Sequence, residues 1–439
     1  MSSSCAGLPE CVKGDGTGLT LPVDTAALMT AGPEFLTEAM RAFGALEPDN
    51  AVAAIVKVVP CALGSTGEKC FLTVAYARPD PRLHDELFVK FSRDFSDAGR
   101  DARGKLEMAG EVRFARYAAM QPLPVPVPKT YFADYDGASH TGLLITETIA
   151  FGAGGIEVQH QKCMDHLIDD PVEHYRAILE ALAKLAAFSS REGAGPPPGE
   201  IFPYDPEALI ASTGLAITVD ERQLQDKLAD LSGFMEECAH LLPATVQPNL
   251  VEAVLAREAL RFLERQDEFV RYLVRPGPQI ALCHWNANID NCWFWRDGDD
   301  VLNCGLMDWG NAGQINLAFA LWGSMSGAPA AIWTDHLPGL LDHFAASHAA
   351  GGGPAIDREA LFLSLHLYVT FMGLSYFLDT PARIRTRTPR IREAHGPLDP
   401  LVTGDASTRN QLHMLGNVLT IWQRFGLGAF ADLNTGASV

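Results

Sequence analysis

Residues 284–310 read HWNANIDNCWFWRDGDDVLNCGLMDWG, and this stretch decides the fold. Within it, two apolar, aromatic-rich runs flank the acidic, glycine-containing turn at residues 297–300. A turn of this kind between two such runs predicts a β-hairpin. Because a hairpin returns the chain to its starting point, Asn291 before it and Asp308 after it are expected to meet at one end.

Asn291 and Asp308 both carry side-chain oxygen atoms. Mg²⁺ prefers such hard ligands, and in phosphoryl-transfer sites it is held by them against the nucleotide phosphates. We therefore interpret the two residues as candidate Mg²⁺ ligands. For the hairpin alone, a buried hairpin with flanking polar turns is the simpler interpretation. The ordered set of residues around it favours the metal site.

This ordered set resembles the aminoglycoside phosphotransferase and choline kinase group, which are small-molecule kinases with a protein-kinase-like fold. Their loop usually reads H-G-D-x-H-x-x-N and is followed by a hairpin and I-D-W. His284, Asn291 and Asp308-Trp309 match these positions. The resemblance implies an α+β, two-lobed protein-kinase-like fold with a small β-rich N-lobe and a larger, mainly helical C-lobe. It also implies ATP and Mg²⁺ as cofactors.

The departures from the family pattern bear on activity. Trp285 replaces the glycine, Asn286 replaces the catalytic aspartate, and Asn288 replaces the second histidine. Further on, Gln314 and Ala318 stand where the family often has two aspartates. These changes leave the fold assignment in place and weaken the assignment of activity.

The N-terminal third of the chain carries segments that fit an N-lobe in the correct order. Apolar runs at 51–61 and 70–76 predict two strands joined by the small-residue turn Gly64-Ser65-Thr66-Gly67, which fits a phosphate-covering turn and equally a plain hairpin turn. The strand at 86–91 contains Lys90, which fits the phosphate-binding lysine and equally an ordinary strand-end charge.

Two later segments complete the nucleotide site that the resemblance implies. Lys105 to Met120 has helical character, with Glu107 and Glu111 one turn apart on one face. We prefer Glu111 as the partner of Lys90, because its context resembles the family's E-x-x-F pattern; a solvated helix charge is the alternative. Residues 143–148 resemble the inter-lobe strand and hinge, where backbone groups of Glu147 and Ile149 would meet adenine.

Composition narrows the class of partner. The net charge of −20 argues against nucleic acid as the main partner, because phosphate backbones need clustered Lys and Arg. No uncharged run of about 18 strongly apolar residues predicts a membrane span, and no secretory signal is evident. The 9 Cys have no spacing typical of small secreted proteins, which favours reduced thiols and a cytoplasmic location. We expect a small-molecule substrate as the partner.

The expected organisation has three parts. We expect residues 1–30 to form a tail or an added strand and residues 31–150 to form the N-lobe. Residues 151–439 are expected to form the C-lobe, which contains the catalytic loop and Asp308. Most of the C-lobe should be helical. Five arginines between 383 and 392 fit an anion site for an acidic substrate, or a basic loop that balances acidic neighbours.

The exchange at Asn286 leaves three hypotheses open. Asparagine can hydrogen-bond a hydroxyl but cannot act as a base at neutral pH. The chain is therefore a phosphotransferase in which Asn286 orients the acceptor and His284 braces the loop, a pseudokinase without turnover, or a kinase-fold enzyme that runs another reaction. If the loop is extended, residues 286, 288 and 290 face one side, which makes Asp290 a candidate substitute base.

Overall fold

The computed structural model describes residues 12–62, 64–190 and 198–426, and these form two compact units. Unit 1 comprises the described residues up to Gly154, the segment that ends at Phe202, and the segment Leu306–Ala312. Unit 2 comprises the remaining described residues. Unit 1 is rich in β-structure and unit 2 is mainly helical, so the expected fold class is confirmed.

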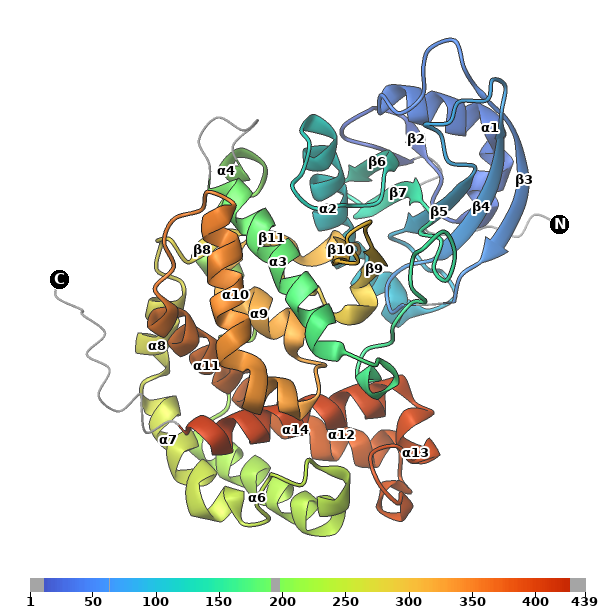
Figure 1. Ribbon diagram of the computed structural model, residues 1–439. Helices are drawn as coiled ribbons and strands as arrows, with labels where there is room; N and C mark the ends of the chain where they lie inside the picture. Colours follow the sequence, from blue (N-terminus) through green and yellow to red (C-terminus); the bar gives the residue numbers. More distant parts are fainter. Residues whose placement is uncertain (1–11, 63, 191–197, 427–439) are drawn as a thin grey trace. The chain divides into compact units, whose positions relative to one another are not determined.

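Unit 1 is built on a five-stranded antiparallel sheet with the order β3-β4-β5-β7-β6 (Figure 1). The strands are β3 (Val52–Pro60), β4 (Lys69–Tyr76), β5 (Glu86–Phe91), β6 (Thr130–Asp136) and β7 (Thr141–Glu147). The three strands expected from apolar runs and the strand expected at 143–148 from the resemblance are all present. The register between β4 and β5 places Lys69 directly opposite Lys90.

Two helices cover opposite faces of this sheet, α1 (Thr25–Ala42) and α2 (Ala98–Met120). Leu143 and Ile145 of β7 pack in the same apolar cluster as α1, whereas Leu144 between them packs with α2. Successive side chains of a strand point to opposite faces, so this alternation fixes which helix covers which side. Helix α2, which carries Glu111, therefore packs against one face of β7. Strand β7 is the neighbour of β5, which carries Lys90.

The described part of the N-terminal segment, from residue 12, contains short strands, the alternative that we set beside a tail. It forms β1 (Val12–Lys13) and β2 (Thr20–Leu21), which pair with one another before α1 begins. The cause is Asp134, whose fully buried carboxylate accepts hydrogen bonds from the backbone N–H groups of Gly16 and Thr17 and from Arg116. A buried carboxylate needs such partners, and the N-terminal turn supplies them.

Unit 2 holds most of the helices and two small sheets. Its longer helices are α3 (Pro171–Ser189), α6 (Glu221–Cys238), α10 (Leu337–Ala350), α11 (Arg358–Ser375) and α14 (Ala406–Phe425). Shorter ones are α5 (Pro206–Ser212), α7 (Ala256–Glu264), α8 (Gln266–Leu273), α9 (Leu317–Met325), α12 (Thr380–Arg387) and α13 (Pro400–Thr403). The short helix α4 (Pro198–Ile201) belongs to unit 1. The two sheets pair β8 (Ile280–His284) with β11 (Ala312–Asn316), and β9 (Cys292–Arg296) with β10 (Leu302–Leu306).

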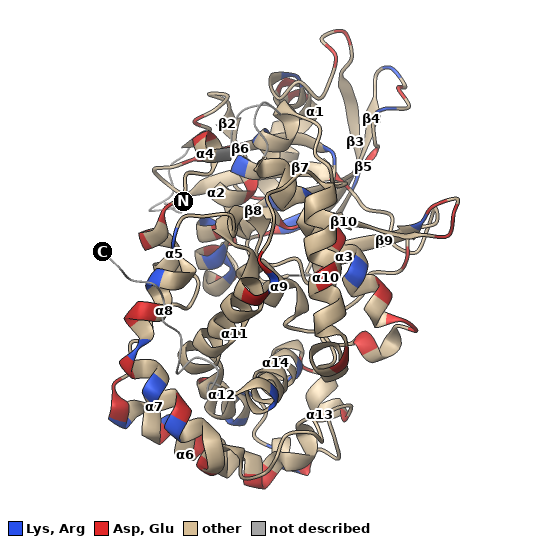
Figure 2. Cartoon of the chain, turned by 60° about the vertical axis from the view of Figure 1, so that its left-hand side comes forward, with Lys and Arg blue, Asp and Glu red and all other residues tan. Residues whose placement is uncertain are grey.

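The arginines between 383 and 392 pair with acidic side chains of unit 2. Figure 2 shows basic and acidic residues interspersed along α6 and α7, and acidic residues of α6 accept part of these contacts. The pairs are Arg383 with Asp379, Arg385 with Asp230 and Glu237, Arg387 with Asp405, Arg390 with Glu393, and Arg392 with Glu237. The cluster thus balances acidic neighbours, which is the structural alternative we set beside an anion site.

One stretch, Arg358–Arg387, is apolar enough to cross a membrane by length and composition. It spans α11 and α12 with a break between them, and 78% of its most apolar window is buried inside the protein. A buried core helix passes the same test, and Leu361, Leu365 and Leu367 are each almost fully buried. Helix α11 is therefore a core helix of unit 2.

Candidate active site

Three charged side chains meet in unit 1, Lys90, Glu111 and Asp308. The Nζ of Lys90 pairs with the Glu111 carboxylate and lies 3.0 Å from Oδ1 of Asp308. Lys90 and Glu111 are buried, whereas the Asp308 side chain is 40% exposed. Burial by itself would lower the pKa of Lys90, but Asp308 and Glu111 outweigh it and raise that pKa, so the lysine stays cationic. The expected Lys90–Glu111 ion pair is present.

Asp308 belongs to unit 1 by packing, although we had placed it in the C-lobe. Trp309 stacks on Phe114 of α2 with ring centroids 3.5 Å apart. Gly110 of α2 allows the chain to approach, because a Cβ at this position would lie 2.3 Å from the carbonyl oxygen of Gly310. Asp308 itself has a positive φ of 65°. This backbone turn directs its carboxylate toward Lys90 and Glu111.

Lys69 is a further cation that the sequence reasoning missed. It begins β4 opposite Lys90, is buried, and donates from Nζ to the carbonyl oxygen of Thr66 in the small-residue turn. Burial, and then the charge of Lys90, lower the pKa of Lys69 to about 8. The sequence signal was available, since Lys69 lies two residues after the turn, but only the strand register pairs it with Lys90.

The turn Gly64-Ser65-Thr66-Gly67 is fastened to the start of α2. Arg103 donates to the carbonyl of Ser65 and Arg100 to that of Gly67. The N–H of Gly67 donates to the carbonyl of Arg100 at 3.0 Å, so this amide is already engaged within the protein. Of the four residues expected to cover phosphates, Gly67 therefore cannot offer its N–H in this conformation.

The expected hinge residues follow directly on β7. The carboxylate of Glu147 accepts from the N–H of Lys129 at 2.7 Å and lies 3.0 Å from Nε2 of His84. Its N–H donates to the carbonyl of Lys129, and its own carbonyl accepts from the Thr146 hydroxyl. The carbonyl of Ile149 accepts from Phe151. The Glu147 side chain is thus structural, and its backbone N–H is already engaged. The carbonyls of Glu147 and Ile149 each keep a second lone pair with which they could accept a hydrogen bond from adenine.

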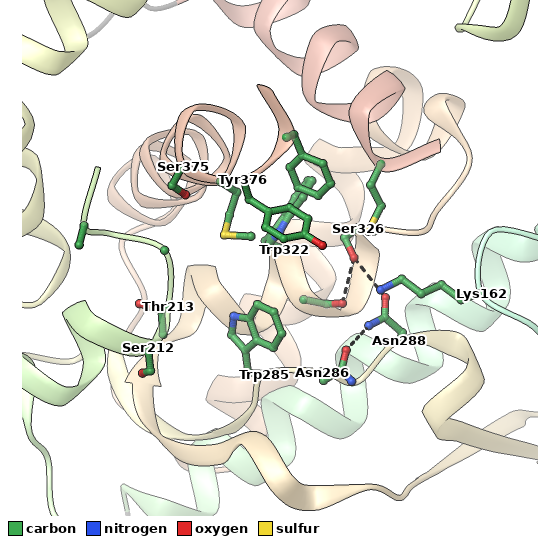
Figure 3. A pocket seen from close by; sticks show the side chains of 16 residues that line it. Lys162, Ser212, Thr213, Trp285, Asn286, Asn288, Trp322, Ser326, Ser375 and Tyr376 are labelled. Atoms are coloured by element: carbon green, nitrogen blue, oxygen red, sulfur yellow. Dashed lines mark hydrogen bonds between the residues drawn. The ribbon is translucent and has the colours of Figure 1, made fainter. Parts of the chain in front are cut away.

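The catalytic-loop segment of unit 2 is a hydrogen-bonded network of amides, seen in Figure 3. Fully buried His284 accepts the N–H of Asn286 on Nδ1 at 3.1 Å, which braces the loop in the expected way. Asn288 donates to Oδ1 of Asn286 at 2.5 Å and accepts from the Ser326 hydroxyl at 3.2 Å. Asn291 donates to the carbonyl of Asn286 at 2.8 Å.

The expectation for Asp290 depends on an extended loop, and the loop is not extended. Ile289–Asn291 forms a 3₁₀ turn, which breaks the alternation that the expectation required. Asn286 and Asn288 line a pocket, and Asp290 is not among its lining residues. The condition under which Asp290 could act as a substitute base is therefore not met.

The pocket beside Asn286 has a volume of about 470 Å³ and lies within unit 2. Figure 3 shows Trp285, Trp322, Tyr376 and Lys162 around the amide pair. Trp285, at the family's glycine position, donates from Nε1 to the Tyr368 hydroxyl at 2.8 Å and forms one wall. These residues come from segments far apart in the chain, so no sequence pattern could have found the pocket.

Helix α9 follows the hairpin and packs tightly on the loop. A Cβ at Gly323 would lie 1.5 Å from the carbonyl oxygen of Trp285, so only glycine permits this approach. Asn316 caps the helix by accepting the N–H of Ala318 at 3.0 Å. Ala318 is fully buried in the first turn. The position where the family often has an aspartate is thus part of the apolar core here.

Comparison with solved structures gives matches at low identity. APH(2'')-IIIa in complex with GDP and kanamycin matches at 16% identity and a TM-score of 0.42, over 79% of this chain and 91% of that chain. A choline/ethanolamine kinase family protein from Mesorhizobium loti matches at 15% identity and a TM-score of 0.37, over 89% and 99%. Spectinomycin phosphotransferase APH(9)-Ia in complex with ADP and spectinomycin matches at 11% identity and a TM-score of 0.38, over 84% and 92%.

These structures come from the group that the loop sequence resembles, the aminoglycoside phosphotransferases and choline/ethanolamine kinases. No protein-family model and no curated protein sequence matches the chain. The TM-scores lie below 0.5, so these likenesses do not assign a function to this chain.

Proposed function

We propose that this protein is an ATP- and Mg²⁺-dependent phosphotransferase that acts on a hydroxyl of a small molecule in the cytoplasm. The observation that carries the proposal is the contact of Lys90 with both Glu111 and Asp308. A kinase-like site needs a strand lysine held by a helical glutamate, together with a metal-binding aspartate. A surface charge at the end of a strand would not be buried between two carboxylates.

We assign Asp308 as a ligand of Mg²⁺, and Asn291 stays the second ligand that the sequence predicts. The partly exposed carboxylate of Asp308 is a hard oxygen donor, and the carboxylates of Glu107 and Glu111 have oxygen atoms within 4.8 Å of it, so the donor set suits a hard cation. When bound, Mg²⁺ would neutralise charge on the phosphates. Because Glu111 is engaged by Lys90, we assign it to positioning that lysine.

The chain's own residues divide the remaining work between binding and orientation. Lys90 and Lys69 supply positive charge for the phosphates, and Glu111 fixes the position of Lys90. Oδ1 of Asn286 accepts one hydrogen bond from Asn288. Its second lone pair can accept a hydrogen bond from the hydroxyl of the substrate that receives the phosphate. His284 holds the backbone of Asn286. The loop thus orients the hydroxyl without removing its proton as a base.

Phosphate transfer to a library of hydroxylated metabolites tests this function. We expect Mg²⁺-dependent transfer from [γ-³²P]ATP to at least one acceptor, with GTP tested alongside, and loss of transfer in Asp308→Asn. Binding of MgATP without transfer to any acceptor would contradict the proposal and favour a pseudokinase. Transfer that continues after chelation of Mg²⁺ would contradict the assigned metal dependence.

Nucleotide affinity should depend on pH through Lys69. Its pKa is lowered to about 8, so the free protein loses this positive charge as the pH rises through 8. Because phosphates bind the charged form, affinity for MgATP should fall about tenfold between pH 7 and pH 9. Titration with a fluorescent ATP analogue measures this.

Two variants separate Lys69 from other titrating groups. Lys69→Arg keeps its charge over this range and should flatten the pH profile. Lys69→Gln should bind weakly at pH 7 and also show no decline. A wild-type affinity that is constant from pH 7 to pH 9 would argue against contact between Lys69 and the phosphates.

A further inference from the structure

We infer that the pocket beside Asn286 takes an acceptor with a largely apolar ring body and no positive charge. The inference rests on the proposed function, because it treats this pocket as the acceptor site. It goes further by naming the class of acceptor. It also sets this chain apart from a phosphotransferase whose acceptor carries amino groups.

The walls of the pocket are aromatic and rigid. Trp322 is almost fully buried, with ring centroids 5.6 Å from Trp333 and 6.0 Å from Phe377. Trp285 is fixed through the Tyr368 hydroxyl, which itself donates to the carbonyl of Thr213 at 3.1 Å. Indole and phenol faces held in this way favour a flat apolar ligand, because they gain contact area without losing side-chain freedom.

Two sets of polar side chains line the pocket. The hydroxyls of Ser212, Thr213 and Ser375 donate to backbone carbonyls one turn earlier in their own helical segments, so they are already engaged. Asn286, Asn288 and Ser326 form a continuous hydrogen-bonded chain along the pocket (Figure 3). An acceptor hydroxyl can bond to this chain while the ring lies against the aromatic walls. A ligand with many polar groups would leave several of them against Trp and Met side chains without partners, which is unfavourable.

The charge of the pocket favours an anion over a cation. Among the described residues that line it, none is Asp or Glu, and the one charged residue is Lys162. In Figure 3 the Lys162 side chain reaches toward Asn288 and Ser326. Arg383, which pairs with Asp379, already covers the Tyr376 ring with its guanidinium carbon 4.2 Å from the ring centroid. An amine bound here would be desolvated beside like charge, whereas a carboxylate would gain attraction.

Three naphthyl ethanol probes of one shape test the inference in the full-length protein. They are the parent alcohol, a carboxylate derivative and an aminomethyl derivative, and binding is followed by quenching of tryptophan fluorescence without nucleotide. We expect the parent and the carboxylate to bind, and the aminomethyl compound to bind at least about tenfold more weakly. Kanamycin, a polycation, should not compete with the parent.

Charge reversal at Lys162 should invert the relative affinities of the two charged probes. Lys162→Glu is expected to favour the aminomethyl compound over the carboxylate by about tenfold or more. Lys184→Glu is the matched control, because it makes the same change at an exposed position on α3 outside the pocket. It should leave the order unchanged. Circular dichroism and binding of the neutral parent show whether the Lys162 variant keeps its fold and its pocket.

The outcomes that overturn this inference differ from those that overturn the proposed function. Tighter binding of the aminomethyl probe or of kanamycin to the wild type, or failure of all three probes to bind, would overturn the acceptor class. Phosphate transfer to a polycationic acceptor would also overturn it, while leaving the phosphotransferase function intact. Binding of the predicted probes with no phosphate transfer to any acceptor would support the pocket and contradict the phosphotransferase.

Discussion

Asp308→Asn is expected to abolish the stabilisation that ATP gives the protein in the presence of Mg²⁺. A ligand that binds only the folded state stabilises it by about 2.7 kcal/mol at 100 times its Kd. The wild type should gain this stability from ATP with Mg²⁺ and much less from ATP with a chelator. Thermal unfolding of wild type and variant, with and without each component, measures the difference.

Asparagine is the most specific replacement for Asp308. Asp308 has a positive φ of 65°, and asparagine tolerates that backbone conformation better than alanine does. Lys90 keeps its contact with Glu111, so the buried lysine is not left without a partner. The change therefore removes one charged oxygen ligand and leaves the shape in place.

The exposed turn of the β9–β10 hairpin offers the matched control. Asp299→Asn removes the same charge from an exposed position in that turn and should retain the full gain from MgATP. If Asp308→Asn is as strongly stabilised by MgATP as the wild type, Asp308 is not a metal ligand. Loss of the gain in both variants would show that the effect is one of overall charge.

Asn286→Asp is expected to raise phosphate transfer about 10- to 100-fold, because it supplies a base at the hydroxyl. The local network accepts the change, since Asn288 donates to Oδ1 of Asn286 and a carboxylate accepts this hydrogen bond equally well. Steady-state transfer from ATP to the acceptor found in the library screen gives kcat and KM for both proteins. The gain should appear in kcat, because the base acts in the transition state.

The same substitution separates the three hypotheses. Robust transfer by the wild type that Asn286→Asp abolishes would mean that the enzyme uses the amide, in which case a new carboxylate repels the phosphate oxygens. No transfer by either protein fits a pseudokinase. Asn249→Asp, at an exposed asparagine of unit 2 outside the pocket, controls for the added charge.

Local sequence signals determined the architecture of the chain. Apolar runs predicted the strands β3, β4 and β5, because the burial pattern of a strand depends on its own residues. The strand β7 was predicted from the resemblance of residues 143–148 to the inter-lobe strand. The glycine-containing acidic turn predicted the β9–β10 hairpin for the same reason. Lys90 and Glu111 were matched by position in these elements, and their ion pair followed once the elements packed.

Contacts between distant segments decided the rest. The stacking of Trp309 on Phe114 brought Asp308 into unit 1, and the β4–β5 register brought Lys69 opposite Lys90. The 3₁₀ turn at Ile289–Asn291 replaced the extended loop on which the expectation for Asp290 depended.

The acceptor pocket is the feature that the sequence alone could least predict. Its walls come from a loop after β8, the segment around Lys162, the end of α5 and the helices α9, α11 and α14. Each of these residues has an ordinary role in its own segment, and Trp285 or Tyr376 alone predicts nothing about a ligand. The shape and charge of a pocket depend on which side chains packing leaves facing one space, and that is fixed by the tertiary structure alone.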